Sequence, residues 1–519
     1  MEGQNLAISL PAELLGEIMR HYVDIDELQE LQEPDNMTKW ANIQHICTRW
    51  RKVALSTPSL WAYIHFGWPA HVVARFLARS RKAHLHIGIN KDAFTSGNFP
   101  RFHDELNSLL NRVERLSIKW CPYHQPHGYL VPDPNPISSV LLNWISDILN
   151  GKHKVPHLWQ LHLKFYEREP VRTETLSNLP HLLEICSRSI SLTTLLPVSY
   201  QLRRVDIDYC HTSPIHLINL LASAPMLEDV HFFHENEYDI IHEGSFEDLS
   251  SNQSTISLSH LKTFTIGWCR SSFVDELLSR ITYPPSAEIS LSICREPSAR
   301  IMTDFPLSLR SALRFSTSLS IDVERYRIGE ALSAAPFALH FSSPRSADYH
   351  VDFNERGARS ERIAESSEMI DDISSMGPFE NLQYFSIAMA LLPDSHTMTR
   401  LFDGCSEIEN LAVTVRDIDN LITALSPSES TTPPCPKLRT LSLFNSKFNP
   451  FALRDVIQER NKQTVPLKEL RLRKNRRLRP NEAGFPSVVS VLSRLEGMVV
   501  TIEEDIDEYS SSPSETDSE

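Results

Sequence analysis

The feature that most constrains this chain is a short apolar pattern, L-x-x-L-x-L, that recurs along most of its length. Successive side chains of a strand point to opposite faces, so the fourth and sixth residues share one face. Strands that pair in sequence would stack these residues into a shared core, one layer at a time. The last five copies begin 26, 30, 29 and 28 residues apart. The copies begin at Val113, Leu158, Leu202, Leu227, Leu261, Leu382, Ile408, Leu438, Leu467 and Leu495.

Helical periodicity appears between several of these predicted strands, most clearly at residues 137–149 and 214–222. The first three copies lie 45 and 44 residues apart, farther than the last five. Between residues 273 and 380 the pattern predicts strands only at 319–321 and 337–341. The fold class predicted is therefore α/β. An irregular array of β/α repeats is favoured, with a compact α/β domain as the alternative.

Some copies also have Cys or Asn at their ninth position, which completes the pattern L-x-x-L-x-L-x-x-N/C. This longer pattern resembles the leucine-rich repeat, whose units span about 20–29 residues. The resemblance implies an irregular leucine-rich-repeat-like solenoid over residues 69–502, with the ninth side chain bonding backbone groups where the strand ends. We expect these cysteines to be structural and reduced. The ninth residues are Cys121, Cys210, Cys269 and Asn475.

Ahead of the repeats, residues 9–68 have the character of short helices. Pro11 suits the first helical position, and Glu13 suits the positive end of a helix dipole. A second helix places Ile43, Ile46, Cys47, Trp50 and Ala54 on one face, and Pro58 ends it. Helices this short bury only a small core, so we expect them to lean on a partner or on the repeats.

The same segment resembles an F-box, in particular those of fungal proteins. The residues that carry the resemblance are L-P-x-E-L-L-x-x-I from Leu10, I-C-x-x-W-R from Ile46 and S-L-W from Ser59. One departure is the link over residues 24–39, which is longer and more acidic than usual. The resemblance implies a Skp adaptor and a cullin scaffold as partners. The implied Skp-binding residues are Leu10, Pro11, Leu14, Leu15, Ile18, Ile46, Trp50 and Leu60.

Composition excludes several classes of protein. The net charge is −15, but residues 503–519 supply eight acids and no base, so the rest is mildly acidic and no general nucleic-acid binder. The chain starts without a signal peptide and has no apolar run long enough to cross a membrane. Eight scattered cysteines suit reduced thiols, so we expect a cytoplasmic or nuclear protein.

No catalytic motif is evident, so we predict a protein that is not an enzyme and needs no cofactor. Fifteen glycines leave little room for phosphate-binding loops, and no paired metal-binding histidine motif occurs. Cys121, His124 and His127 have a spacing that suits metal ligands, but a fourth ligand is missing. We therefore predict no metal site.

A basic run near the C-terminus is the remaining charged feature. It is interpreted as a solvated face, or else as a site for an acidic ligand, a phosphate or nucleic acid; nuclear import is a further option. Residues 503–519 form an acidic tail with nothing to bury, and we expect it to be disordered. The residues of the possible acidic-ligand face are Lys468, Arg471, Arg473, Lys474, Arg476 and Arg477.

These observations combine into one organisation: an N-terminal tail (1–8), a small all-α F-box-like domain (9–68), the repeats (69–502) and the acidic tail. The function this implies is that of a substrate adaptor in a Skp–cullin–F-box ubiquitin ligase, with a protein substrate on the repeats. The rival is a repeat scaffold without a ligase role, in which the helices only cap the repeats. A third hypothesis is a nuclear protein that binds nucleic acid through the basic run.

Overall fold

The structure is a computed structural model in which the chain divides into two compact units, each considered by itself. The first comprises Met1–Leu261 with Ile281–Tyr283, and the second Lys262–Arg280 with Pro284–Glu519. Both are mixed α/β structures built on large, mostly parallel sheets. The structure describes residues 10–23, 42–43, 45–95, 98–120, 123–124, 131–132, 139–165, 171–172, 179–188, 190–191, 200–208, 214–233, 255–295, 305–322, 337–344, 346–355, 362–389, 391–415, 417–427, 433–444, 446, 448–463, 466–474, 492, 495 and 498–504.

In the first unit, each strand of the main sheet pairs in parallel with the next strand of the set. The register aligns the apolar positions: Leu116 lies opposite Leu161, and Val205 opposite Val230. Because the aligned residues are buried, they stack into one core layer across the sheet. The strands in sheet order are β1 (Tyr63–His65), β2 (Leu85–Asn90), β3 (Val113–Trp120), β6 (Gln160–Phe165), β8 (Glu184–Arg188), β10 (Arg204–Asp208) and β11 (Asp229–Phe233).

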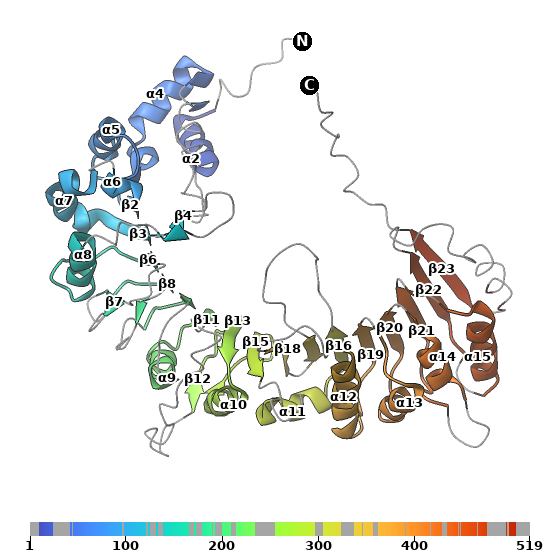
Figure 1. Ribbon diagram of the computed structural model, residues 1–519. Helices are drawn as coiled ribbons and strands as arrows, with labels where there is room; N and C mark the ends of the chain where they lie inside the picture. The colour runs from blue at the N-terminus through green and yellow to red at the C-terminus, as the bar shows by residue number, and fades with distance from the viewer. Residues whose placement is uncertain are drawn as a thin grey trace, which may run out of the picture. The chain divides into compact units, whose positions relative to one another are not determined.

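The connecting helices of the first unit cover one face of this sheet (Figure 1). Phe99 of one helix and Trp144 of the next are buried and meet edge to face at 5.6 Å. The opposite face of the sheet is left to polar side chains. These helices are α5 (Ala70–Ser80), α6 (Asp92–Thr95), α7 (Asn98–Leu109), η3 (Leu110–Arg112), α8 (Ser139–Leu149) and α9 (Pro214–Ser223). Two-residue strands form three small pairs: β4 (Tyr123–His124) with β5 (Val131–Pro132), β7 (Val171–Arg172) with β9 (Ile190–Ser191), and β12 (Ile256–Ser257) with β14 (Ile281–Thr282).

The N-terminal helices form a small cap within the first unit. Two predicted helices are present as α2 (Ala12–Val23) and the 3₁₀ turn η2 (Pro58–Trp61). The predicted second helix is corrected: Cys47 is extended and caps α4 (Thr48–Ser56), so Ile46 and Cys47 are exposed and do not share a face with the buried Ile43 and Ala54. Leu15 and Met19, one helical turn apart on α2, are fully buried. The strand β1 follows η2 at once and pairs with β2, so residues 9–68 include a strand of the sheet.

The second unit repeats this plan with one insertion. From its first strand to its last, all pairings are parallel except the two made by β17, which lies antiparallel between β18 and β16. The strands in sheet order are β13 (Thr263–Cys269), β15 (Glu288–Arg295), β18 (Ser346–Glu355), β17 (Phe337–Ser343), β16 (Ser318–Asp322), β19 (Tyr384–Ala388), β20 (Asn410–Thr414), β21 (Thr440–Phe444), β22 (Glu469–Lys474) and β23 (Val499–Glu504).

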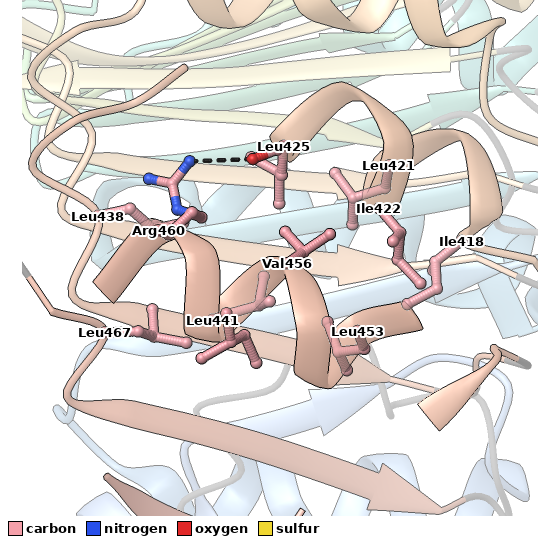
Figure 2. Close-up of a pocket in the computed structure, with 11 residues that line it drawn as sticks. Ile418, Leu421, Ile422, Leu425, Leu438, Leu441, Leu453, Val456, Arg460 and Leu467 are labelled. Carbon is pink, nitrogen blue, oxygen red and sulfur yellow. Dashed lines mark hydrogen bonds between the residues drawn. The ribbon is translucent and has the colours of Figure 1, made fainter. Parts of the chain in front are cut away.

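The helices of the second unit also lie on one face of their sheet (Figure 1). Figure 2 shows how α14 and α15 meet above the sheet: Leu421 and Ile422 face Leu453 and Val456 around a small apolar cavity. Its volume of about 10 Å³ leaves no room for a ligand, so this is packed core. The helices are α10 (Ser271–Arg280), α11 (Leu307–Arg314), α12 (Arg362–Ser375), α13 (Ser395–Asp403), α14 (Asp419–Leu425) and α15 (Pro450–Gln463).

Strands lie where the apolar pattern predicted them in most copies, but three details are corrected. The long step between Leu158 and Leu202 contains β8, in which Ile185 pairs with both neighbouring strands in register. Residues 345–376, where the apolar pattern predicted no strand, contain β18 and α12. Apolar residues alternate there with Asp348, His350 and Asp352, as in a half-buried strand.

The third correction is the frame of the last copy. The pattern placed Met498 and Val500 at the fourth and sixth positions. In the structure Val500 lies opposite Leu470, and Ile502 opposite Leu472, so the frame is shifted by two residues. A shift of two keeps the same face inward, which is why the leucine spacing alone did not reveal it.

The structure tests the ninth position at Cys269 alone, and it corrects the start of the acidic tail. Cys269 is buried, and its thiol donates a hydrogen bond to the Gly267 carbonyl at 3.4 Å. Cys121, Cys210 and Asn475 lie outside the described residues. The backbone of Glu503 and Glu504 belongs to β23, opposite Arg473 and Lys474, so the predicted tail begins two residues too early. Residues 1–8 and 505–519 lie outside the described part.

Candidate functional site

An exposed apolar stripe runs along α2. Leu14, Ile18 and Tyr22 are spaced four residues apart and are 52, 44 and 53% exposed. The neighbouring stripe of Leu15 and Met19 is buried. The helix therefore has one apolar face inside the cap and a second that faces solvent, which is costly for a surface helix unless something binds there.

The predicted Skp-binding residues separate into two groups. Ile46 is 57% exposed, Pro11 is exposed as well, and Leu10 and Trp50 are half-buried. Leu15 and Leu60 are buried inside the cap, where they pack rather than face a partner. Tyr22 joins the exposed stripe, although the F-box resemblance did not include it.

The cap is held together by polar contacts at its edges. Arg49 of α4 donates a hydrogen bond to the Leu10 carbonyl, which fixes the start of α2. Arg20 donates to the Ser59 hydroxyl at 3.3 Å, which ties α2 to η2. The buried Trp61 indole donates to the Ala54 carbonyl at 2.8 Å. These contacts fix the orientation in which α2 presents its exposed stripe.

The face of the first sheet opposite the helices carries polar side chains in rows. Burial alternates along β10, where Val205 and Ile207 are buried and their neighbours are exposed or half-buried. Adjacent strands in register place like positions side by side. One row is Arg115, Gln160, Glu184, Arg204 and Asp229; the next is Ser117, His162, Cys186, Asp206 and His231.

Glu184 is the centre of the first row. His162 Nε2 lies 3.2 Å from Glu184 Oε1, and Gln160 Nε2 donates to Glu184 Oε2 at 2.9 Å. Burial acts to raise the pKa of Glu184, but the hydrogen bond and charge of His162, with Gln160 and Arg204, outweigh it and lower the pKa. Glu184 is therefore an ionised, well-bonded carboxylate at neutral pH.

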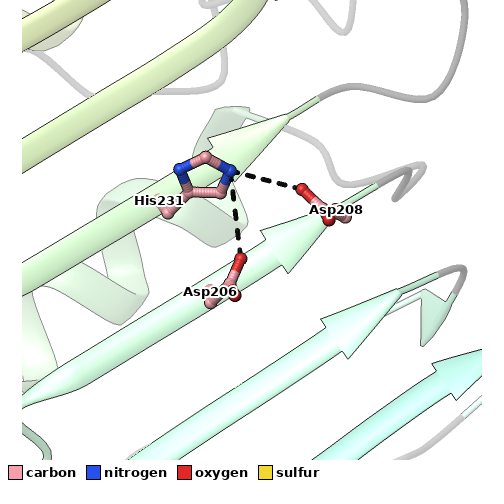
Figure 3. Close-up of side chains that lie close together, drawn as sticks. All are labelled: Asp206, Asp208 and His231. Atoms are coloured by element: carbon pink, nitrogen blue, oxygen red, sulfur yellow. Dashed lines mark ion pairs between the residues drawn. The ribbon is translucent and has the colours of Figure 1, made fainter. Parts of the chain in front are cut away.

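Asp206, Asp208 and His231 form a second cluster on β10 and β11 (Figure 3). His231 Nε2 lies 3.4 Å from Asp208 Oδ1 and 3.9 Å from Asp206 Oδ1, and the Cys186 thiol donates to Asp206 Oδ2 at 3.3 Å. The imidazole and carboxylate ligand atoms lie within 4.8 Å of one another, close enough to hold a metal ion. A protonated His231 between two carboxylates accounts for the same geometry, so we assign an ion-pair cluster.

Charge supports that assignment. Burial acts to lower the pKa of His231, but the hydrogen bond to Asp208 and the charges of Asp206 and Asp208 outweigh it and raise the pKa.

The other end of the same face has the opposite sign: Lys119 and Lys164 lie side by side on β3 and β6. The open face is thus basic over β3 and β6, whereas β10 and β11 carry three carboxylates, Asp206, Asp208 and Asp229, against the two cations Arg204 and His231.

A cavity of about 550 Å³ opens where the cap meets the first strands. Its volume is within the range of ligand-binding clefts. The walls come from α2, η2, β1, β2, β3 and the segments that precede β2 and β6. The lining residues are Arg20, Ser59, Leu60, Ala62, Tyr63, Lys82, Ala83, His84, His86, Glu114, Arg115 and Trp159.

The open face of the second unit differs in chemistry. Its central row is rich in serine, with Ser320 and Ser386 in register on β16 and β19. His340 and His350 meet through their Nδ1 atoms at 2.7 Å, and His350 Nε2 lies 2.8 Å from Asp352. This carboxylate, imidazole and imidazole line is a hydrogen-bonded chain on the open face.

The basic run is only partly described. Lys468, Arg471 and Arg473 are exposed, and Arg471 donates from Nε and Nη2 to both oxygens of Glu469, at 2.8 and 2.9 Å. Arg471 is therefore already paired, as a solvated face would be. The side chains of Lys474, Arg476 and Arg477 lie outside the described residues, as do those of Cys121, His124 and His127, so neither prediction is tested in full.

Sequence reasoning missed the cavity and the Asp206 cluster. His86 lies on β2 and His84 directly precedes it, and both histidines face Glu114: His84 pairs with Glu114, and His86 Nε2 lies 3.6 Å from it. Polar residues that alternate with apolar ones along a strand indicate its open face. No local sequence pattern indicates which strands pair, and so which polar residues come together on that face.

Comparison of the sequence with models of known protein families and with curated proteins finds no match. Among the described residues, no helix combines the length and apolar character needed to cross a bilayer.

Proposed function

We propose that this chain is a non-enzymatic substrate adaptor of a Skp–cullin–F-box ubiquitin ligase. In this proposal the cap is an F-box that binds the Skp adaptor, and each unit is a stretch of leucine-rich-repeat-like solenoid. The observation that carries the proposal is the exposed stripe of Leu14, Ile18 and Tyr22 on α2. An unpartnered apolar helix face on a small cap is what docking on an apolar adaptor surface requires.

The open sheet faces support the second half of the proposal. Among the described residues, the helices lie on one face of each sheet, and the polar rows of the other face are regularly spaced by the strand pairing. Such a surface suits an extended protein segment laid across the strands. We therefore propose that the protein substrate binds there.

The test is the substitution of Leu14→Asp together with Ile18→Asp. Both side chains are exposed in the free chain, so the double variant should fold. A charge buried without a partner in an apolar interface costs several kcal/mol, so affinity for purified Skp should fall on the order of a thousandfold. Isothermal titration calorimetry measures this directly.

A matched control is Val140→Asp on α8, where an exposed apolar residue of similar accessibility lies outside the cap; Val140 is 51% exposed. Its Skp affinity should be unchanged. Equal Skp binding by the wild type and the double variant would rule out this docking surface.

A repeat scaffold without a ligase role remains the second candidate, and one observation favours it. Leu15 and Leu60, both implied Skp contacts, are buried in the cap. An affinity purification from the native cell separates the two. Recovery of Skp and cullin supports the adaptor, whereas other stable partners without them support the scaffold.

A further inference from the structure

The cavity beside the cap has walls of predominantly positive charge. Arg20 comes from α2, Lys82 from the turn before β2 and Arg115 from β3, against the single carboxylate of Glu114. That carboxylate faces His84 and His86, with His86 Nε2 at 3.6 Å. The negative charge is therefore directed at the imidazoles, while Lys82 and Arg115 line the remaining wall beside Arg20, whose Nη1 lies 3.1 Å from Glu17 Oε2.

Arg115 has its guanidinium stacked on an aromatic ring. Its guanidinium lies over the Trp159 ring, 4.5 Å from the centroid, and its Nε atom is buried with no hydrogen-bond partner in the described part of the chain. An aromatic ring fixes the guanidinium plane without occupying its in-plane N–H groups. Those groups suit a bidentate carboxylate.

The cavity is continuous with the open face of the first sheet through strand register. Tyr63, His86 and Arg115 lie in one row across β1, β2 and β3, and the row goes on to Gln160 and Glu184. Beyond β8, the face turns acidic at Asp206 and Asp208. A segment that crosses the strands from the cavity thus meets cations first and carboxylates later.

We propose that the cavity binds the acidic end of a bipolar peptide segment whose basic end lies over Asp206 and Asp208. The inference rests on the proposed function, because it names the class of substrate that the open face would take. From β3 to β10 there are three strand spacings, or roughly 14 Å. An extended chain covers that distance with about four residues. The recognised segment therefore has acidic residues and basic residues about four residues apart.

The probe is a fluorescent synthetic peptide of three glutamates, four glycine or serine residues and three lysines, titrated into the full chain at low salt. A peptide of the same composition with alternating glutamate and lysine is the comparison. We expect the block peptide to bind about tenfold more tightly, because only its charges match both ends of the face. Salt should weaken the binding.

Variants locate the site. Lys82→Glu reverses an exposed charge of the cavity and should weaken the block peptide about tenfold. Lys154→Glu is the matched control, because Lys154 is exposed in the same unit and does not line the cavity. Asp208→Lys should weaken the block peptide and leave an all-glutamate peptide unaffected.

Three results would overturn the inference: no binding by the wild type, equal losses in Lys82→Glu and Lys154→Glu, or equal affinity for the block and alternating peptides. Inorganic pyrophosphate that binds as tightly as the block peptide would identify a small-anion site instead. Skp binding is measured on the same proteins. Skp binding without peptide binding would contradict only this inference. Peptide binding without Skp binding would contradict the proposed ligase role.

Discussion

At the scale of single residues, His65 shows how burial changes the pKa of an imidazole. It lies on β1 against Gly88 of the neighbouring strand, where a Cβ atom would come within 2.7 Å of the His65 ring. The Gly67 N–H donates to His65 Nδ1 at 3.2 Å. Burial lowers the pKa of His65 to about 4, with the charge of Asp92 opposing the shift. The folded state thus holds a neutral imidazole.

The sign of the pH dependence follows from that lowered pKa. As pH falls below about 6.5, the unfolded chain takes up a proton on His65 before the folded one does, so the free energy of unfolding decreases toward pH 4. The full loss is about 3 kcal/mol. His65→Gln should flatten the slope of urea-unfolding free energy over this pH range. An unchanged slope would show that His65 is not the group responsible.

Cysteine reactivity is a second property of single residues. Cys269, Cys405 and Cys435 are buried, and burial raises the pKa of each thiol, for Cys405 to about 12. Because the thiolate is the reactive form, these three should react slowly with thiol reagents in the native state, and exposed Cys47 rapidly. Mass spectrometry of timed labelling measures the rates. Labelling of Cys269 as fast as Cys47 would contradict the strand register around it.

At the scale of elements, helix α15 is tied to the segment that leads into β21 by a buried arginine. Arg460 donates to the carbonyls of Leu425, Pro434 and Cys435 at 3.2, 2.6 and 2.7 Å, and Figure 2 shows its bond to Leu425. Cys435 has a φ of 47°, a left-handed conformation that costs a residue with a side chain about 1 kcal/mol or more. The arginine offsets that strain by bonding the carbonyls on either side.

Arg460→Leu should therefore lower the free energy of unfolding by about 3 kcal/mol, since it leaves three carbonyls without their donor. Arg460→Lys keeps the positive charge but loses the planar guanidinium group. Its free energy of unfolding should lie between those of the wild type and the leucine variant. Urea denaturation gives both values. A leucine variant as stable as the wild type would show that other donors satisfy these carbonyls.

At the scale of the whole molecule, the two units share one plan but differ in the chemistry of their open faces. The first carries charged rows and the cavity, and the second carries serines and the His340, His350 and Asp352 chain. Helix α2 serves three purposes at once in the first unit. Leu15 packs in the cap, Leu14 and Ile18 form the exposed stripe, and Arg20 lines the cavity. The proposed adaptor and substrate contacts thus meet in one helix.

Sequence alone determined where most strands lie, because burial alternates within a few consecutive residues and leaves a local signal. The apolar spacing by itself places Leu161, Val205 and Leu441 on inward strand faces, and helical periodicity places the helices of the cap. Tertiary structure decided the rest, because pairing depends on partners far apart in the chain. It inserted the β17 and β18 hairpin into a parallel sheet, buried Leu15 and Leu60, and brought Arg20 and Trp159 to one cavity. No local pattern records contacts across that many residues.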